Sequence, residues 1–189
     1  VLRSTRVATV HALATQKSEP EAMWHDETCC AARVRASSSV PEWTDAFACG
    51  LYVVTGGLGG LGLRACTLLA TDGALRVLLA SRSGRVGRDG QGLEAQLQSM
   101  GAVAAVLVGD SDEQVDTRTL HGVGPSSGLL HAAGVGDRGL LSELDAARVW
   151  WVHRSKALGA WHLYCATSAL PLNARVLFSS VGSGLGNVG

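Results

Sequence analysis

The sequence has no surplus of charge of either sign. Its 16 lysine and arginine residues balance 16 aspartate and glutamate residues, and the two signs are interspersed along 189 positions. A polyanion would need a basic stripe, so we expect no nucleic-acid partner. Long apolar runs are missing too, because glycine, arginine or histidine interrupts each one well before the roughly 20 residues of a membrane span. We therefore expect no membrane partner.

Metal-ligand spacings are also lacking. The five cysteines form no CxxC pair and no cysteine–histidine pattern suited to zinc, and their odd number argues against a disulfide framework. Our interpretation is no metal site and reduced thiols in the cytoplasm. A plastid stays an alternative, since the first 18 residues carry Arg3, Arg6 and Lys17 but no acid. The start at Val1 is explained more simply by an excised piece of a longer protein.

Residues 1–48 differ from the rest of the chain. They are rich in serine and alanine, contain Pro20 and Pro41, and show no sustained period of 2 or 3.6 residues. We interpret them as a linker or the remnant of a neighbouring domain, partly irregular. Residues 49–189 are predicted to form a second, regular domain.

From Leu51 onward, continuous apolar runs alternate with helical patterns. The runs are 51–54, 75–80, 103–108, 128–131 and 174–178, and they are typical of strands buried on both faces. Helices are predicted over 61–71, over 92–100, and from an N-cap at Ser142 to about residue 168. This alternation predicts an α/β fold, a Rossmann-like doubly wound parallel sheet with helices on both faces.

A glycine-rich loop follows the first of these strands and opens the first helix. It reads TGGLGGLG and comprises Thr55, Gly56, Gly57, Leu58, Gly59, Gly60, Leu61 and Gly62. Helix starts favour anions, and positions without side chains let a diphosphate approach the main chain. The context of strand, loop and helix is the one that a dinucleotide-binding loop requires, so we predict dinucleotide binding here.

The second strand ends in Ser81, Arg82 and Ser83, with no acid at its tip. In dinucleotide folds this tip faces the adenosine ribose, where an acid accepts from a free 2′-hydroxyl and an arginine accommodates a 2′-phosphate. The residues therefore favour NADPH as the cofactor. A solvated loop arginine is the alternative reading of Arg82.

The loop spacing resembles the phosphate loop of short-chain dehydrogenases/reductases. Its fuller form is similar to that of the ketoreductase domain of modular polyketide synthases and animal-type fatty acid synthases. The resemblance implies that Asp110, with Ser111 in place of the usual valine, contacts the adenine. It also implies that the turn LHAAGV lines the cofactor site, through His131, Ala132, Ala133 and Gly134. The segment between Asp116 and Gly128 is shorter than usual in the family, so we expect a trimmed helix there.

Two segments resemble the catalytic part of the same family. RSKALGAWHL places Lys156 at the position of the catalytic lysine, and RVLFSSVGSGLGNVG places Ser180 at that of the catalytic serine, 24 residues later. Without the resemblance, Lys156 could simply extend to solvent from an apolar helix, and the serine could be the polar end of a strand.

The family's proton-donor tyrosine follows the serine at a longer distance than the nine residues left here. The only tyrosines are Tyr52 and Tyr164, and neither is followed four residues later by lysine. We therefore expect the sheet to be incomplete at the C-terminus and the tyrosine to fall beyond Gly189. This chain by itself should not be a competent reductase.

The resemblance implies an NADPH-dependent 3-ketoacyl reductase in polyketide or fatty acid biosynthesis. Its substrate would be a β-ketoacyl thioester on an acyl carrier protein, reduced to the β-hydroxyacyl form, with other synthase domains as neighbours. Two alternatives stay open: a non-catalytic nucleotide-binding scaffold module of a synthase, and a free-standing short-chain reductase. The sequence leaves acyl chain length and alcohol stereochemistry undetermined.

Overall fold

The computed structural model describes residues 23–25, 28–30, 50–86, 92–122, 124–136 and 139–180. These residues divide between two compact units. The larger unit includes the described residues from 50 to 178, and the smaller includes two short strands together with Ser179 and Ser180. The short strands, β1 (Met23–His25) and β2 (Thr28–Cys30), pair antiparallel and were not predicted. The rest of the irregular segment 1–48 lies outside the described residues, and its assignment as a linker stays a prediction.

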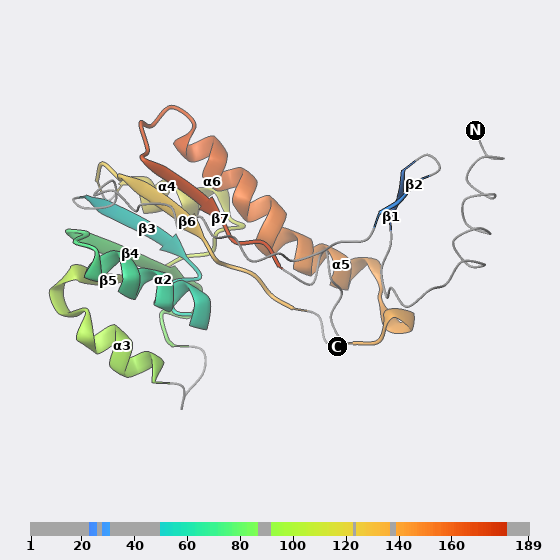
Figure 1. Cartoon of the computed structure of the whole chain (residues 1–189), viewed down its shortest axis with the longest axis horizontal. Helices are drawn as coiled ribbons and strands as arrows, with labels where there is room; N and C mark the ends of the chain where they lie inside the picture. The colour runs from blue at the N-terminus through green and yellow to red at the C-terminus, as the bar shows by residue number, and fades with distance from the viewer. Residues whose placement is uncertain are drawn as a thin grey trace. The chain divides into compact units, whose positions relative to one another are not determined.

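The larger unit is built on a parallel sheet of five strands in the order β5-β4-β3-β6-β7 (Figure 1). The strands are β3 (Leu51–Thr55), β4 (Arg76–Ser81), β5 (Ala104–Val108), β6 (Gly128–His131) and β7 (Ala174–Leu177). Each lies within one or two residues of a predicted apolar run. The order confirms the doubly wound fold, and its topological switch point lies between β3 and β6.

Helices cover both faces of the sheet, as Figure 1 shows. On one face lie α2 (Gly60–Thr71) and α3 (Leu93–Ser99), over a core that includes Tyr52, Val54, Leu79 and Leu130. On the other lie α4 (Gln114–Gly122) and α6 (Gly159–Thr167), over a core of Val53, Leu78, Ala80, Leu120, Leu129 and Leu163. Successive side chains of a strand therefore pack into the cores on opposite faces of the sheet, which explains why the strands are continuous apolar runs in the sequence.

The short segment after Asp116 lies largely in the nine-residue helix α4, and its trimming relative to the family stays a prediction. A second prediction about a helix is wrong. The long helix predicted from Ser142 to residue 168 begins later and is not continuous. Its N-cap is Asp145, whose carboxylate accepts the Arg148 N–H at 2.8 Å, and Ser142 lies in a separate 3₁₀ turn, η3 (Leu141–Glu143). An aspartate side chain accepts a first-turn amide as well as a serine side chain does, so the sequence alone could not decide between Ser142 and Asp145 as the N-cap.

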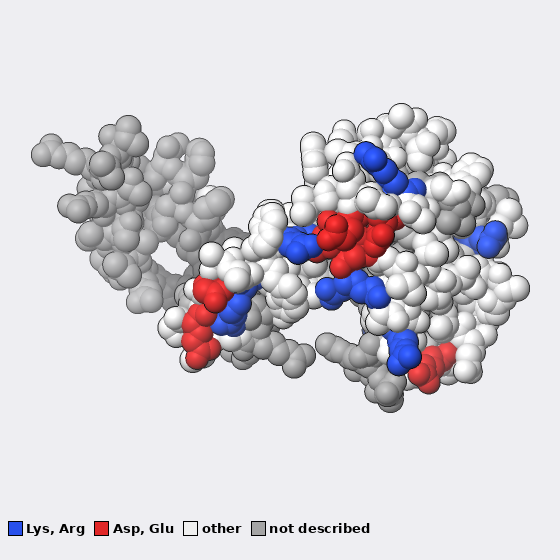
Figure 2. All heavy atoms as spheres, turned by 180° about the vertical axis from the view of Figure 1, so that it is seen from behind, with Lys and Arg blue, Asp and Glu red and all other residues white. Residues whose placement is uncertain are grey.

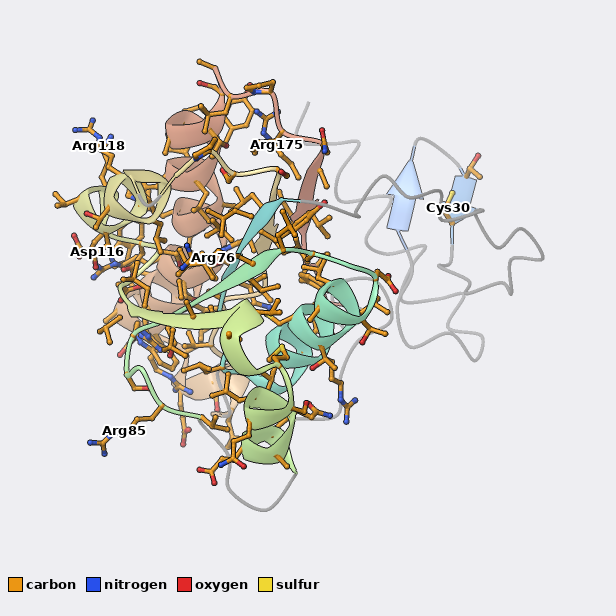
Figure 3. All side chains as sticks on the ribbon, turned by 90° about the vertical axis from the view of Figure 1, so that its left-hand side faces the viewer. Cys30, Arg76, Arg85, Asp116, Arg118 and Arg175 are labelled. Atoms are coloured by element: carbon orange, nitrogen blue, oxygen red, sulfur yellow. The ribbon has the colours of Figure 1, made fainter. Side chains whose placement is uncertain are left out.

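The helical segment that follows Asp145 contains a π-helical turn. It consists of α5 (Ala146–His153), the π turn η4 (Arg154–Leu158) and α6. The Gly159 N–H donates to the Arg154 carbonyl five residues earlier, which widens the helix by one residue. At the far end of α6, the Arg175 guanidinium of β7 donates to the carbonyls of Thr167 and Leu170, at 2.6 and 3.1 Å (Figure 3). A cation there complements the helix dipole.

Among the described residues, no helix is both long enough and apolar enough to cross a membrane.

Candidate dinucleotide site

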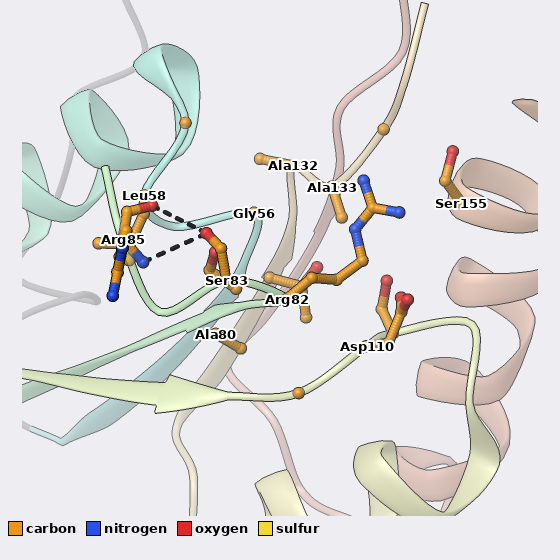
Figure 4. Close-up of a pocket in the computed structure, with 16 residues that line it drawn as sticks. Gly56, Leu58, Ala80, Arg82, Ser83, Arg85, Asp110, Ala132, Ala133 and Ser155 are labelled. Carbon is orange, nitrogen blue, oxygen red and sulfur yellow. Dashed lines mark hydrogen bonds between the residues drawn. The ribbon is translucent and has the colours of Figure 1, made fainter. Parts of the chain in front are cut away.

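The carboxyl ends of β3, β4, β5 and β6 surround a cavity of about 350 Å³ at the switch point of the sheet (Figure 4). This is where open α/β sheets place their ligands. The predicted site residues that line it are Thr55, Gly56, Leu58, Gly59, Ser81, Arg82, Ser83, Asp110, Ser111, Ala132, Ala133 and Gly134. Residues predicted from four separate segments of the sequence thus share one cavity.

Other predicted residues lie outside this lining, namely Gly57, Gly60, Leu61, Gly62, His131, Lys156 and Ser180. The sequence analysis missed four that belong to it: Ala80, Arg85, Gly109 and Ser155. Ala80, Gly109 and Ser155 each directly precede a predicted site residue, so their place in the sequence could have indicated them. Arg85 had a signal as well, because it is a second arginine on the same loop as Arg82.

Three glycines of the loop are required by close contact of main chain with main chain. Gly56 has a φ of +69°, and a Cβ on it would lie 2.6 Å from the Ala133 nitrogen. A Cβ on Gly57 would lie 2.8 Å from the Leu79 Cβ of β4, and one on Gly62 would overlap the Gly56 carbonyl oxygen. These contacts hold the loop against β4 and the turn after β6, which makes a rigid wall for the cavity.

Gly59 and Gly60 have a different surrounding. A Cβ on Gly60 would meet nothing within 4 Å, and Gly59, the N-cap of α2, makes no side-chain capping bond. The first bond within this turn runs from the Leu63 N–H to the Gly59 carbonyl at 2.8 Å. The Gly59 N–H donates to the Gly56 carbonyl at 2.9 Å, so the donors that the first helical turn leaves over are those of residues 60–62, where the helix dipole also favours an anion.

Two guanidinium groups come from the loop after β4. Figure 4 shows the Arg82 side chain extending across the cavity mouth toward Ala133 and Ser155. Ser83 folds this loop, because its hydroxyl both accepts the Arg85 N–H and donates to the Arg85 carbonyl, each at 3.2 Å. Arg85 points outward at the edge of the molecule (Figure 3). The pair makes this end of the cavity electropositive.

Asp110 follows β5 and lines the same cavity as Arg82. Burial, and then the neighbouring Asp112, raise the pKa of the Asp110 carboxyl, while the Arg82 guanidinium opposes the rise. The Asp110 N–H donates to the Asp116 carboxylate of α4 at 2.8 Å, so α4 fixes this loop.

An ion pair joins the same loop to the π turn. The Arg154 guanidinium contacts the carboxylates of Asp112 and Glu113, each at 3.1 Å. Figure 2, a view from behind, shows acidic side chains lying beside basic ones on that face of the molecule. The loop after β5 and the turn that carries Lys156 are therefore tied together at the surface.

His131 is buried beneath the cavity rather than lining it. Its Nδ1 lies 2.6 Å from the Thr55 hydroxyl, and its Nε2 lies 3.1 Å from the Lys156 carbonyl oxygen. Burial lowers the pKa of the imidazole, and hydrogen bonds to the main chain of Lys156 and Ser155 oppose this in part. The side chain thus links β3, β6 and the π turn.

Lys156 lies on the π turn, with its side chain exposed. Its alkyl stem lies against Gly134, where an added Cβ would be 2.8 Å from the lysine Cε. The adjacent Ser155 is buried, and its hydroxyl accepts the Val135 N–H at 3.2 Å. The lysine therefore lies next to the cavity lining, and its catalytic role stays a prediction.

Ser180 and the two tyrosines are placed differently. Ser180 is exposed and belongs to the smaller unit, so its predicted catalytic role stays a prediction. Tyr52 is fully buried in the sheet, and Tyr164 is an exposed residue of α6 whose ring stacks on Trp161. The described residues hold no group of three or more histidine, cysteine or acidic side chains that could bind a metal ion.

Comparison with known proteins identifies the family. The KR domain family matches residues 50–189. The chain belongs to this ketoreductase family. As a curated relative, polyketide synthase GfsB of Streptomyces halstedii is 39% identical over 152 residues, covering 78% of this chain and 3% of that protein. Erythronolide synthase EryA2 of Saccharopolyspora erythraea is 36% identical over 143 residues, covering 74% and 4%. The KR domain thus spans only a small part of these synthases.

Solved ketoreductases share the fold of this KR domain. An A-type ketoreductase from a modular polyketide synthase gives a TM-score of 0.69 at 27% identity, covering 97% of this chain and 40% of that chain. The first ketoreductase of the tylosin synthase gives 0.70 at 26% identity, covering 95% and 40%. The resemblance to polyketide synthase ketoreductases and the Rossmann-like fold are both confirmed.

Substitutions at two loop glycines should separate structural from open positions. Gly56→Ala should lower the free energy of unfolding by at least about 1–3 kcal/mol, because it forces a left-handed backbone on alanine and a clash with Ala133. Gly60→Ala is the matched control and should change it by no more than about 0.5 kcal/mol. Urea denaturation followed by circular dichroism measures both. Equal losses would contradict the contacts described for Gly56.

Acid should destabilise the domain through His131. Because its folded-state pKa lies below the ordinary 6.5, the unfolded chain takes up the proton first. The histidine's contribution to stability is thus complete above about pH 6.5 and is lost as the pH falls toward the folded-state pKa. Urea denaturation between about pH 7.5 and 5 measures the slope.

The comparison variants for this slope are His131→Gln, which should flatten it, and His153→Gln on the exposed side of α5, which should not. An unchanged slope in His131→Gln would show that another group is responsible.

Proposed function

We propose that this KR domain binds NADPH and takes part in reducing a β-ketoacyl thioester on an acyl carrier protein to the β-hydroxyacyl form. The observation that carries the proposal is the single cavity at the switch point. The phosphate-loop glycines, Arg82, Asp110 and the Ala132–Gly134 turn all border it. The family assignment and the names of the relatives support the polyketide setting.

The residues present fit the cofactor. The open main chain at Gly59 and Gly60 would hold the diphosphate, since the start of α2 attracts anions and nothing within 4 Å fills the space above Gly60. Arg82 would hold the 2′-phosphate, because a guanidinium fork matches phosphate oxygens. Asp110 and Ser111 would border the adenine, and the Ala132–Gly134 turn the ribose and nicotinamide.

Bound NADPH would supply the hydride for the reduction. The chain's own residues would orient the cofactor and stabilise charge on the carbonyl oxygen. Lys156, next to the cavity lining at Gly134, would hold the ribose and lower the pKa of the proton donor. Ser180 would donate a hydrogen bond to the carbonyl oxygen of the substrate. A cytoplasmic location, with neighbouring synthase domains as partners, completes the proposal.

A non-catalytic nucleotide-binding module is the second candidate. One observation favours it: neither of the chain's two tyrosines is placed as a proton donor, since Tyr52 is in the core and Tyr164 stacks on the surface of α6. The two candidates share the cofactor site and differ in turnover. A phenol from outside the described residues would decide between them.

Removing the Arg82 guanidinium should change cofactor preference. Arg82→Ala should weaken NADPH binding about 10- to 100-fold, the worth of one or two charge-assisted bonds to phosphate. NADH binding should change little, because it lacks the 2′-phosphate. Isothermal titration with both nucleotides measures the effect.

Arg118→Ala on the exposed side of α4 is the matched control for this test (Figure 3). Equal loss of NADPH and NADH affinity in Arg82→Ala would contradict the placement of the 2′-phosphate. No binding of either nucleotide by the unmodified chain would contradict the proposed function.

The 189-residue chain alone should reduce β-ketoacyl thioesters about 10²- to 10⁴-fold more slowly than a ketoreductase that has a positioned tyrosine. The reason is the missing general acid, not the cofactor site, so NADPH binding should persist. NADPH oxidation at 340 nm with a β-ketoacyl thioester measures the rate. Turnover at the rate of an intact ketoreductase domain would show that the expectation is wrong.

A further inference from the structure

The buried imidazole of His131 lies between the phosphate-loop strand and the lysine turn. His131 ends β6 and is the register partner of Thr55, which ends β3, so the two side chains share one face of the sheet. Thr55 is 2% exposed and His131 is 3% exposed. On this face the next layer contains the π turn and α6, and the imidazole reaches the main chain of that turn.

The partners of the ring settle which nitrogen carries the proton. The Lys156 carbonyl can only accept, so the His131 Nε2 carries a hydrogen and donates to it at 3.1 Å. In the neutral ring the Nδ1 is then an acceptor, and the Thr55 hydroxyl donates to it at 2.6 Å. The Lys156 carbonyl therefore requires the Nε2–H tautomer, and the Thr55 hydroxyl stabilises that tautomer by donating to Nδ1.

The π turn makes the direction of Lys156 sensitive to this bond. Beyond the turn, α6 is anchored by Leu163 and Thr167, both fully buried. The turn contains one residue more than an α-helical turn, and its conversion to α-helix would rotate Lys156 relative to α6 by about 100°, one residue of helix. Because the π-helical turn is rarer than the α-helical one, we expect a specific contact to stabilise it.

Gly159 lets the ring come close enough to make that contact. A Cβ on Gly159 would lie 3.1 Å from the His131 Cε1 and 3.0 Å from the Ser111 hydroxyl. The lack of a side chain on Gly159, the first residue of α6, therefore leaves room for the imidazole and for the loop after β5. Ring, glycine and π turn fit together as one packed arrangement.

We infer that His131 is a positioning residue, whose Nε2–H bond to the Lys156 carbonyl holds the π turn and directs the lysine side chain along Gly134. The Thr55 hydroxyl maintains the tautomer that makes this bond. The consequence for catalysis rests on the proposed function of Lys156 at the bound cofactor. The effect of His131 on the position of the Lys156 side chain does not rest on that function, and it can be measured in the cofactor-free protein.

Two substitutions of His131 divide its hydrogen bonds. The glutamine amide nitrogen reaches about as far as the imidazole Nε2, so His131→Gln keeps a donor for the Lys156 carbonyl. The asparagine amide reaches only as far as Nδ1, so His131→Asn keeps a partner for Thr55 but loses the hydrogen bond to the Lys156 carbonyl. A purely structural role would give similar effects in the two variants, scaled to their loss of stability.

The lysine content of the chain offers a specific probe. Lys17 and Lys156 are the only lysines, so Lys17→Arg leaves Lys156 alone. Reductive methylation with ¹³C-formaldehyde labels it as dimethyl-lysine, which keeps its charge. The ¹³C shift and pH titration of that signal report its surroundings in the full chain. The same protein unfolded in urea gives the reference, and thermal unfolding is recorded for every variant.

In His131→Asn we expect the Lys156 signal to move toward its urea position and the dissociation constant for NADPH to rise about three- to tenfold. In His131→Gln we expect both to stay close to the parent values. A second pair keeps the test decisive if a His131 variant fails to fold. Thr55→Val should disturb the Lys156 signal, because it leaves the buried Nδ1 of this tautomer without its donor, and Thr55→Ser should not.

The inference is overturned if glutamine and asparagine disturb the signal equally, or if neither disturbs it while both fold. If the parent protein binds no NADPH, the proposed function fails, yet the lysine signals of the four variants still decide the role of His131.

Discussion

Contact between bare main chain at the ends of β3 and β6 governs the arrangement of the whole site. Gly56 lies directly against Ala132 and Ala133, with no room for a methyl group between them. Because neighbouring parallel strands end at the same edge, this contact puts the phosphate loop and the Ala132–Gly134 turn on one surface. Arg82 and Asp110 then follow from the pairing of β4 and β5. A cavity formed by strand ends in this way is rigid wherever the sheet is rigid.

The π turn is held from three sides, which couples the two ends of the cavity. Arg154 pairs with Asp112 after β5, the Ser155 hydroxyl accepts the Val135 N–H after β6, and the main-chain carbonyl of Lys156 accepts the Nε2–H of His131. The end of the cavity at Asp110 and the end at Lys156 thus share a single frame. The Arg154 side chain is 38% exposed, which weakens its ion pair with Asp112, so the bonds of the buried Ser155 and His131 side chains are the stronger part of this frame.

The sheet and most of the cavity could be predicted from the sequence because they depend on local patterns. Strands buried on both faces leave continuous apolar runs, and the glycine loop has a fixed spacing. The bounds of α4 could not be predicted because, among its side chains that the structure describes, Thr117 and Leu120 alone are buried, too few to give a helical period. The π turn could not be found, since an i to i+5 bond leaves no mark in residue order.

His131 was placed at the cofactor by resemblance, yet its partners are 76 and 25 residues away in sequence. No local pattern contains such contacts.

The strand β7 closes one side of the described sheet, and its Val176 and Leu177 are exposed. A strand in that position presents unpaired amide and carbonyl groups to anything extended that comes near. Two copies of such a surface can join edge to edge, which begins aggregation. A covering segment over the β7 edge would therefore keep copies of this domain from joining through their sheets.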